Sequence, residues 1–431
     1  MRPFRGSAGL KPLVAFCFIA ALSWGAESIS AQTAIKEDLY NEVVFLRGLE
    51  LGAGGRALAL GGAYRALSDD LSALYWNPAG LASVRRIEAT LGVSQALTLD
   101  ETQVGIYTAS DRLSRTRLNE VGLVFPIPTY RGSLVFALGY HQVHGYDSFG
   151  TFRTEGADFT FQGDELETGR LGIWSLGMAI DLSPVVSAGL ALRLWKGYND
   201  YSWYADTTYS NLNWYHYDQS IDMDLSGFNA ITGVLLRPSP WLRLGATLET
   251  PLKLSVDESY SDLIENSDAG EYDYDSFSAH YDYKISRPFR GGVGAAAMIG
   301  PVGVSGDAVL NDWSQISFGD EPSFLGLDRD QANREIARNL KFTVDLHFGV
   351  EFWVPNTSAR LQAGYAWLPS PFEGDEVISD KHVFNGGISA LLDPSLLLQA
   401  SMSWAGWDRS LGGWGEDLQL THLLLTLSYR I

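Results

Sequence analysis

Cysteine is nearly absent from the 431 residues, and basic residues are scarce. The one cysteine, Cys17, excludes a disulfide framework within the chain. Lys and Arg number 31 against 51 Asp and Glu, so the net charge is −20, and the chain lacks the basic surface that nucleic-acid phosphates require. Beyond the N-terminus no apolar run approaches the roughly 18 residues that indicate a transmembrane helix.

The first 31 residues have the three parts of a secretory signal peptide. Basic residues precede the apolar run 13–26, and small residues fill 28–31. The run has about 14 residues, which is too short for a spanning helix. We predict that residues 1–31 are removed near Ala31, which leaves a mature chain without cysteine.

From Arg85 onward, apolar and polar residues alternate. In 340–353 every second residue from Leu340 to Phe352 is apolar, and the residues between them are mostly polar. Alternate residues of a strand point to opposite faces, so this segment predicts a strand. Soluble proteins show the same alternation, but their strands average about 5–6 residues. A strand of about 14 residues is long enough to cross a membrane, for which about 9–11 suffice.

The same pattern recurs in fourteen segments along the chain. We expect strands at 85–97, 117–125, 131–142, 169–181, 185–199, 224–237, 240–254, 280–298, 301–315, 338–353, 358–367, 381–392, 396–408 and 418–431.

Connections between these segments alternate between short and long. The short ones contain proline and are 126–132, 181–184, 237–240, 299–301, 354–358 and 392–395. We expect long loops at 98–116, 143–168, 200–223, 255–279, 316–337, 368–380 and 409–417. Short turns on one side and long loops on the other are typical of outer-membrane barrels. A soluble β-sandwich or propeller would have shorter strands, and no propeller-length repeat is present. The sequence therefore predicts an all-β, 14-stranded antiparallel transmembrane β-barrel over residues 85–431, located in the bacterial outer membrane.

Residues 32–84 are not needed for the wall, and we expect them to form an N-terminal hatch (plug) in the lumen. Fourteen strands enclose more space than their own side chains fill, because eight strands are just filled and sixteen to eighteen leave a channel. Within the hatch, 68–76 is predicted to be a short helix with Ser68 as N-cap. Asn77 precedes Pro78, which disfavours helical geometry at Asn77 and ends the helix.

The stretch GRALALGGAYRALSDDLSALYWNPAGLA (55–82) resembles the hatch signature of the FadL/TodX family of outer-membrane transport proteins for long-chain fatty acids and aromatic hydrocarbons. The likeness lies in the Gly-Arg-Ala run, the acidic pair and the Asn-Pro-Ala triplet. The resemblance implies a hatched fourteen-stranded barrel that takes up hydrophobic small molecules passively, holds them in an apolar pocket and releases them sideways at a kinked third strand. The residues carried over are the hatch motif Asn77, Pro78 and Ala79, the hatch or pocket candidates Asp69, Asp70, Tyr75 and Trp76, and the lateral-gap candidates Gly132 and Gly139.

Two features leave alternatives open. Glycine in a strand can permit close packing instead of a kink, which applies to Gly132 and Gly139. The glycine-dense hatch also resembles a PorV-like sister group, whose barrels bind or shuttle exported proteins for a secretion system. An apolar, ligand-sized pocket beneath Tyr75 and Trp76 would favour transport, whereas a packed lumen would favour the binding barrel.

No other motif indicates a different activity. The acidic segment 254–280 is expected to be a solvated loop, with divalent-cation binding as the alternative. The aromatic-rich segment 201–218 fits either a capture groove or an interfacial girdle. None of the seven histidines accompanies a hydrolase or metalloprotease motif, so we predict no enzyme, no metal site and no cofactor. The expected partners are a hydrophobic ligand, outer-membrane lipid and lipopolysaccharide, with exported proteins under the alternative function.

Overall fold

A computed structural model describes residues 39–41, 43–46, 48–268, 270–322, 327–374, 377–411 and 414–431. The predicted signal peptide, 1–31, and the first residues of the predicted hatch lie outside this range.

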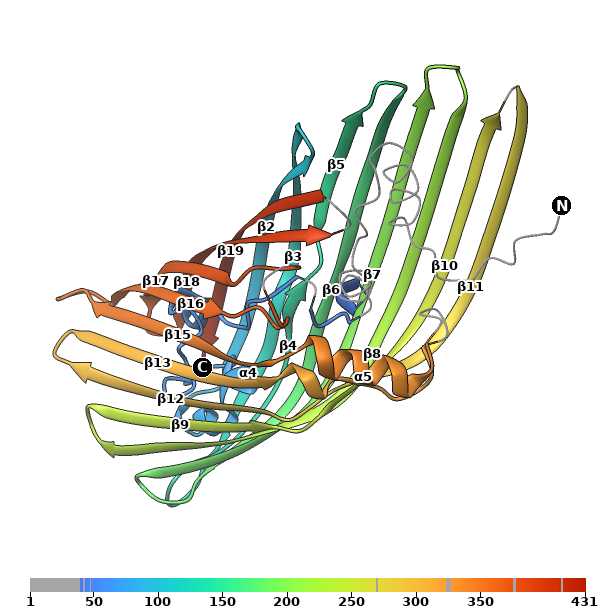
Figure 1. Ribbon diagram of the computed structural model, residues 1–431. Coiled ribbons are helices and arrows are strands. Elements are labelled where there is room, and N and C mark those ends of the chain that lie inside the picture. Colours follow the sequence, from blue (N-terminus) through green and yellow to red (C-terminus); the bar gives the residue numbers. More distant parts are fainter. Residues whose placement is uncertain are drawn as a thin grey trace.

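The chain forms a closed antiparallel barrel of fourteen strands, as the alternating sequence predicts (Figure 1). Pairing of the last strand with the first closes the wall, from Gly415 opposite Gln103 to Arg430 opposite Glu88. The strands are β2 (Glu88–Val104), β3 (Tyr107–Ile127), β4 (Leu134–Gly145), β5 (Ser148–Glu155), β6 (Phe159–Asp181), β7 (Val186–Tyr209), β8 (Trp214–Ser239), β9 (Leu242–Glu249), β10 (Leu252–Asp268), β11 (Glu271–Arg287), β12 (Arg290–Ile299), β13 (Val302–Asp312), β15 (Phe342–Trp353), β16 (Ala359–Leu368), β17 (Lys381–Asp393), β18 (Leu396–Leu411) and β19 (Trp414–Arg430).

Three of the fourteen wall strands are interrupted, so each comprises two elements. β4 and β5 form the third strand, β9 and β10 the seventh, and β11 and β12 the eighth. Pro251 and Pro288 lie at the last two breaks, where a residue without an N–H cannot join the ladder. The remaining elements are β1 (Leu49–Glu50), α3 (Gly55–Ala59), α4 (Ala73–Trp76), the 3-10 helices η1 (Pro78–Ser83) and η2 (Trp313–Gln315), β14 (Ser317–Phe318) and α5 (Arg329–Asn339).

The short turns are found where proline and its neighbours predict them. For example, β6 leads into β7 across 182–185, and β15 into β16 across 354–358. The prediction of long loops at 98–116, 143–168, 200–223, 255–279 and 409–417 is wrong, because the strands continue through these segments as paired hairpins, most extensively in β7–β8 and β10–β11. The β7–β8 and β10–β11 hairpins rise beyond the rest of the barrel as a tall wall (Figure 1). Their outward faces lie beyond the apolar belt and carry charged residues, so hydrophobic alternation does not mark them as strands.

The outer surface of the barrel carries an apolar belt. Every one of the fourteen strands presents a large exposed apolar side chain, including Leu91, Leu123, Leu138, Leu176, Leu194, Phe228, Leu248, Val293, Val304, Phe348, Leu361, Phe384, Met402 and Leu425. So continuous an apolar surface is unfavourable in water, and it is suited to contact with the hydrocarbon core of a membrane. The fold is therefore that of an outer-membrane-type barrel. None of the described helices is long and apolar enough to cross a membrane.

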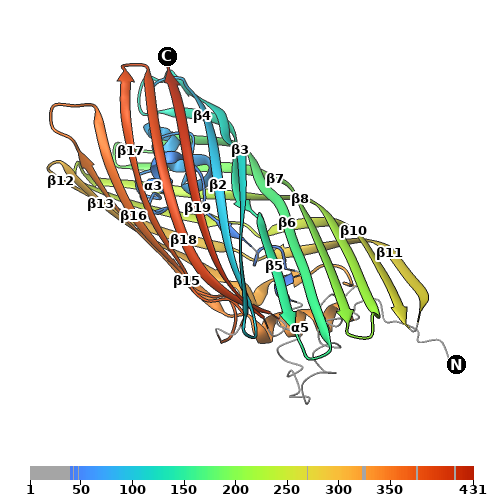
Figure 2. The ribbon, with the colours of Figure 1, turned by 90° about the horizontal axis from the view of Figure 1, so that it is seen from above.

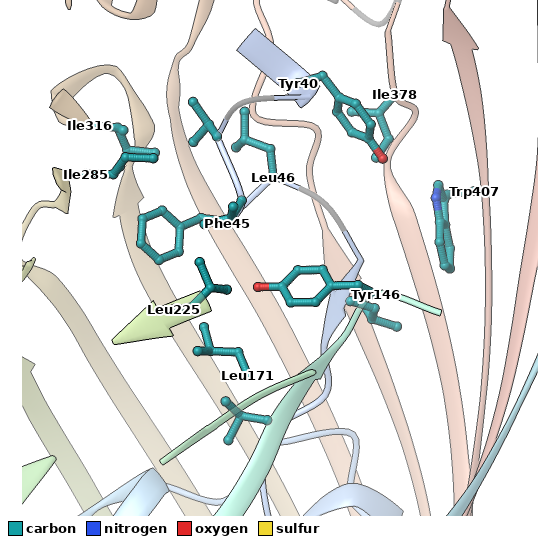
Figure 3. Close-up of a cluster of buried hydrophobic side chains, with 14 of the residues drawn as sticks. Tyr40, Phe45, Leu46, Tyr146, Leu171, Leu225, Ile285, Ile316, Ile378 and Trp407 are labelled. Carbon is teal, nitrogen blue, oxygen red and sulfur yellow. The ribbon is translucent and has the colours of Figure 1, made fainter. Parts of the chain in front are cut away.

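The hatch lies inside the barrel, towards the short turns (Figure 2). Farther towards the hairpins, the lumen is filled by apolar side chains from the N-terminal segment and the wall (Figure 3). The labelled members of this cluster are Tyr40, Phe45, Leu46, Tyr146, Leu171, Leu225, Ile285, Ile316, Ile378 and Trp407.

Candidate functional site

The hatch motif forms a rigid link between two short helices. Asn77 ends α4 with an extended backbone (φ −160°, ψ 101°), as expected for a residue before proline. Its side-chain oxygen accepts a hydrogen bond from the backbone N–H of Ala79 (3.1 Å), so Asn77 also caps η1. Pro78 occupies the first turn of η1, where a missing N–H is harmless.

The N-cap prediction for Ser68 is wrong. Helix α4 begins at Ala73, with Ser72 before it. Ser68 instead donates its hydroxyl to the Tyr64 carbonyl (2.8 Å), and Asp70 accepts hydrogen bonds from the Ser72 N–H (3.0 Å) and hydroxyl (2.6 Å). Asp70 therefore organises a turn before the helix, since polar side chains close to a helix start compete for its free N–H groups.

The hatch motif is fastened to the barrel wall at two glycines. The Asn77 amide donates to the carbonyls of Arg65 (2.8 Å) in the hatch and of Val234 (3.2 Å) in β8. A Cβ on Gly233 would lie 2.0 Å from Asn77 Oδ1, and one on Gly189 would lie 2.3 Å from the carbonyl carbon of Pro78. Gly189 and Gly233 face each other across β7 and β8, so the wall is thinned at the contact.

Arg56 joins the hatch to the opposite wall. Its guanidinium binds both carboxylate oxygens of Glu351 in β15 (2.7 and 2.9 Å) and Asp69 in the hatch (2.9 Å). The Tyr64 hydroxyl lies between the two acids, 3.2 Å from Asp69 and 3.1 Å from Asp70. Buried bidentate arginine pairs are strong and geometrically specific, so this contact fixes the orientation of α3.

The pKa values of the two adjacent acids, Asp69 and Asp70, are shifted in opposite directions. Burial raises the pKa of Asp69, but the guanidiniums of Arg56, Arg243 and Arg360 outweigh it and lower the pKa below its usual value. Burial and the neighbouring Asp69 carboxylate raise the pKa of Asp70. Asp69 is therefore the ionised partner of Arg56, whereas the charge on Asp70 is disfavoured.

Tyr75 and Trp76 lie on the other face of the hatch. The Tyr75 hydroxyl donates to Glu50 in β1, and the Trp76 indole N–H donates to the Ala53 carbonyl (2.7 Å). Arg193 from β7 lies over the Tyr75 ring, 5.4 Å from its centroid, and donates to the Leu74 carbonyl (3.1 Å). Both aromatic side chains are thus held by their polar ends while their rings face the lumen.

Glu50 is the centre of a charged cluster at the hatch. Its carboxylate contacts Arg290 (2.9 Å) and Arg287 (3.4 Å) as well as the Tyr75 hydroxyl. Burial raises its pKa, but the two guanidiniums and the Tyr75 hydrogen bond more than offset this and hold the pKa well below the usual value.

One pocket lies against Tyr75 and Trp76. This hatch pocket has a volume of about 90 Å³ and includes Phe45, Leu46 and Leu368 in its lining. A second, the wall pocket, has a volume of about 70 Å³ and lies between the third strand and the inner faces of β2, β3, β18 and β19. Both are smaller than the roughly 150 Å³ of an engineered cavity that binds benzene.

The two pockets share a thin partition. Gly48, Leu49 and His144 line both of them. The partition is made by β1, which pairs with the end of β4 through Leu49 opposite Gly145 and Glu50 opposite His144. Displacement of Leu49 and Glu50 would join the hatch pocket to the wall pocket.

The wall pocket adjoins the break in the third strand. The ladder between β3 and β4 runs only from Leu134 to His141, and its register with β6 slips between Gln142 and His144. Beyond the break, β5 pairs with β6 alone among the described strands. Side chains bridge the separation: Arg117 binds Asp147 (2.5 and 2.8 Å), and the Thr98 hydroxyl donates to the Asp147 carbonyl (2.9 Å).

The two lateral-gap candidates lie away from this break. Gly132 has a positive φ of 74° in the turn before β4, and Gly139 is regularly paired with Gly122 and Ser175. A Cβ on Gly139 would lie 3.0 Å from a methyl of Leu71, so this glycine makes room for the hatch. The predicted strand 131–142 ends at this break, but a loop was expected over 143–168, where β5 and the first part of β6 instead continue the wall.

Several residues of the site were not expected from the sequence. Gly189, Gly233, Glu50 and His144 belong to segments far from the hatch motif or without a chemical signature of their own. Asp307 in the wall is buried as well, and it accepts hydrogen bonds from the Arg65 backbone (2.9 Å) and side chain (3.2 Å).

One exposed group has ligand types suited to a metal. Asp257, His280 and Asp282 lie on the outer face of β10 and β11, with one ligand atom of each within 4.8 Å of the others. All three side chains are exposed to solvent, so the cluster fits a hydrated surface.

Comparison with known proteins supports the fold. No family model and no curated protein matches the chain. Among solved structures, the toluene transporter TodX of P. putida matches with a TM-score of 0.62 and 13% identity over 89% of this chain and 99% of its own. A Pseudomonas aeruginosa FadL homologue matches with a TM-score of 0.59 and 14% identity over 89% and 98%. The toluene transporter TbuX of Ralstonia pickettii matches with a TM-score of 0.57 and 13% identity over 89% and 99%. The resemblance to the FadL/TodX family is thus confirmed at the level of the fold.

Proposed function

We propose that this chain is an outer-membrane channel for the passive uptake of hydrophobic small molecules, either long-chain fatty acids or aromatic hydrocarbons, with the hatch as its gate. The observation that carries the proposal is the pair of small pockets divided by β1, one against Tyr75 and Trp76 and the other beside the break in the third strand. The toluene transporters TodX and TbuX, which have the same fold, support this class of ligand.

The first step is capture from outside into the apolar lumen. Aromatic and aliphatic side chains fill the space beyond the hatch, and an apolar ligand gains free energy by replacing contacts with water. The pockets are closed in this structure, because neither has the volume that benzene needs. Entry therefore requires β1 to leave its place against β4.

The second step is release through the wall. On the short-turn side of the hatch, the lumen is lined by charged side chains of the rim, including Arg243 and Arg360, where a hydrocarbon would be poorly solvated. The break between β4 and β5 adjoins the wall pocket, and in the proposed channel it is the exit towards the apolar outer surface. In the proposed channel, Asn77, Pro78 and Ala79 hold the hatch closed against water and ions. Gly139 leaves space for Leu71 of the hatch to pack against the wall.

A binding barrel that presents exported proteins is the second candidate. It is favoured by the tightly filled lumen, since the pockets together fall short of the several hundred cubic ångströms usual for ligand sites. A protein partner would engage the tall hairpins β7–β8 and β10–β11 and would need no hatch movement.

Locking β1 to β4 separates the two candidates. The described residues contain no cysteine, so a Leu49→Cys, Gly145→Cys variant would carry one reducible bond across the directly paired positions. Uptake of labelled oleate and toluene by cells lacking their own transporter would be measured with the bond oxidised and reduced. A Thr232→Cys, Leu248→Cys pair on the outer face is the matched control.

We expect uptake by the wild type, loss of uptake in the oxidised Leu49–Gly145 variant and recovery after reduction. The control pair should transport in both states. Two results would reject the gated channel and direct the search to protein partners. One is no uptake by the folded wild type, and the other is equal uptake by the oxidised and reduced Leu49→Cys, Gly145→Cys variant.

A further inference from the structure

A third cavity lies on the short-turn side of the hatch, away from the two pockets. It has a volume of about 380 Å³. The hatch, the start of β2 and the rim ends of β9, β16, β17, β18 and β19 line it. We call it the rim chamber, and its charged lining residues are Arg56, Asp69, Asp70, Arg85, Arg86, Glu88, Arg243, Arg360 and Arg430.

The rim chamber is strongly basic in an acidic protein. Six guanidiniums line it against three carboxylates, although the whole chain has a net charge of −20. One of the three carboxylates, Asp70, has a raised pKa because of burial and Asp69. The imbalance makes the chamber a local positive potential between low-dielectric walls.

Two of the six guanidiniums, those of Arg86 and Arg243, form no ion pair within the described part of the chain, and those of Arg85 and Arg360 form only long ones. Arg243 is partly buried, and its guanidinium has no ion pair or hydrogen bond within the described part of the chain. Arg86 donates to the carbonyl of Pro394 (3.1 Å), and Arg360 lies 3.8 Å from its nearest carboxylate, Glu351. These three come from separate elements, the start of the wall, β9 and β16, and converge on one cavity.

The geometry points to an oxyanion site, and we propose that the rim chamber binds a small phosphate-type anion through Arg243 and Arg360. Planar guanidiniums match the oxygens of phosphate in pairs, which ammonium groups do not. A water molecule takes about 30 Å³ in the liquid, so about 380 Å³ admits a phosphate or pyrophosphate with part of its hydration shell.

The anion would connect the hatch to the barrel. Arg56 of α3 lines the chamber with a side chain that is 5% exposed, while Arg243 and Arg360 belong to the wall. An anion held between them adds attraction on the closed side of the gate. The rim chamber is separate from the apolar pockets, so anion binding there can be tested independently of hydrocarbon uptake.

The test is titration of the full-length protein, purified in neutral detergent, with sodium pyrophosphate at an ionic strength kept constant with chloride. We expect binding at one site per barrel. Because the Arg243 guanidinium forms no ion pair or hydrogen bond within the described part of the chain, Arg243→Gln should leave the fold intact and weaken pyrophosphate binding at least tenfold. Arg131→Gln, an exposed arginine in the β3–β4 turn at the same end of the barrel, is the matched control and should change the affinity less than twofold.

A second arm identifies the source of the phosphate. The protein would be placed in nanodiscs of phosphatidylcholine alone or with phosphatidylglycerol. Competition by phosphatidylglycerol that Arg243→Gln abolishes assigns the chamber to a lipid headgroup, and equal affinity in both nanodiscs assigns it to a soluble anion. No saturable binding in detergent, or equal weakening by Arg131→Gln, would overturn the proposal.

Discussion

Arg56 and Glu351 form a bidentate ion pair that ties the hatch helix α3 to strand β15, with Nε–Oε2 and Nη2–Oε1 distances of 2.7 and 2.9 Å. Their side chains are 5% and 1% exposed, so neither charge has access to much water. Arg56 of the hatch therefore compensates a buried charge of the wall, and this ion pair holds the hatch in place. This contact gives the most direct way to weaken the hatch without touching the pockets.

Glu351→Gln should loosen the hatch while leaving the barrel folded. Removing one charge of a buried pair costs about 3–5 kcal/mol, and Asp69 compensates Arg56 in part, so we expect a loss of about 2–4 kcal/mol. Hydrogen exchange followed by mass spectrometry would show faster exchange in 55–76 and unchanged exchange in β7. Glu101→Gln, an exposed acid on β2, is the control. Unchanged exchange in the hatch would contradict the structural role of the pair.

Gly233→Ala should displace the hatch motif from the opposite side. The added Cβ would lie 2.0 Å from Asn77 Oδ1, well inside van der Waals contact, so Asn77 or the strand must move. Overpacking of this kind typically costs about 1–3 kcal/mol. Single-channel recording in planar bilayers should then show ion leakage. Gly386→Ala, whose nearest heavy atom would be 3.8 Å away, should keep the barrel closed.

The double variant Asn77→Ala, Pro78→Ala tests the motif itself. It removes the amide that donates to the Arg65 and Val234 carbonyls and the oxygen that caps η1. Leaving buried carbonyls unpaired costs about 1–3 kcal/mol. We expect the uptake rate of labelled fatty acid to change in this variant while the barrel remains heat-resistant. An unchanged uptake rate would separate the motif from the gate.

The period-two pattern was enough to predict the barrel, its strand number and the proline-containing turns, because these follow from local geometry. The heights of β7, β8, β10 and β11 were not predictable, since strands above the membrane need no apolar outward face. The sequence predicted that Asn77 and Pro78 end a helix. The wall glycines that contact them, Gly189 and Gly233, lie more than a hundred residues away in the chain and were not predicted. The predicted strand 131–142 ends near the break at Tyr146 and Asp147, but its continuation as β5 depends on contacts with distant strands and was not predicted.

The ion pair between Arg117 and Asp147 should control the break in the third strand. Their side chains are 11% and 6% exposed, and Arg117 also donates to the Gly169 carbonyl (2.9 Å). A double-mutant cycle with Arg117→Ala and Asp147→Ala should give a coupling free energy of about 1–3 kcal/mol. Both single variants should take up toluene faster than the wild type. Equal rates in all four proteins would move the exit elsewhere in the wall.

Glu50 should make the closed state sensitive to acid. Burial raises its pKa, but Arg290, Arg287 and Tyr75 lower it further than burial raises it, so the folded pKa lies below the unfolded one. The ionised form is therefore favoured by folding, and its stabilisation of the hatch is complete above the ordinary pKa of 4.5. This stabilisation is lost progressively as the pH falls from there towards the folded pKa.

Ion conductance of the wild type should rise over that acidic range and be low at neutral pH. Glu50→Gln should conduct at neutral pH already and lose most of the pH dependence, because the neutral amide cannot pair with the two guanidiniums. If the variant kept the acid-induced rise of the wild type, another carboxylate would have to carry it, and Asp345, 3.8 Å from Arg290, is the next to replace.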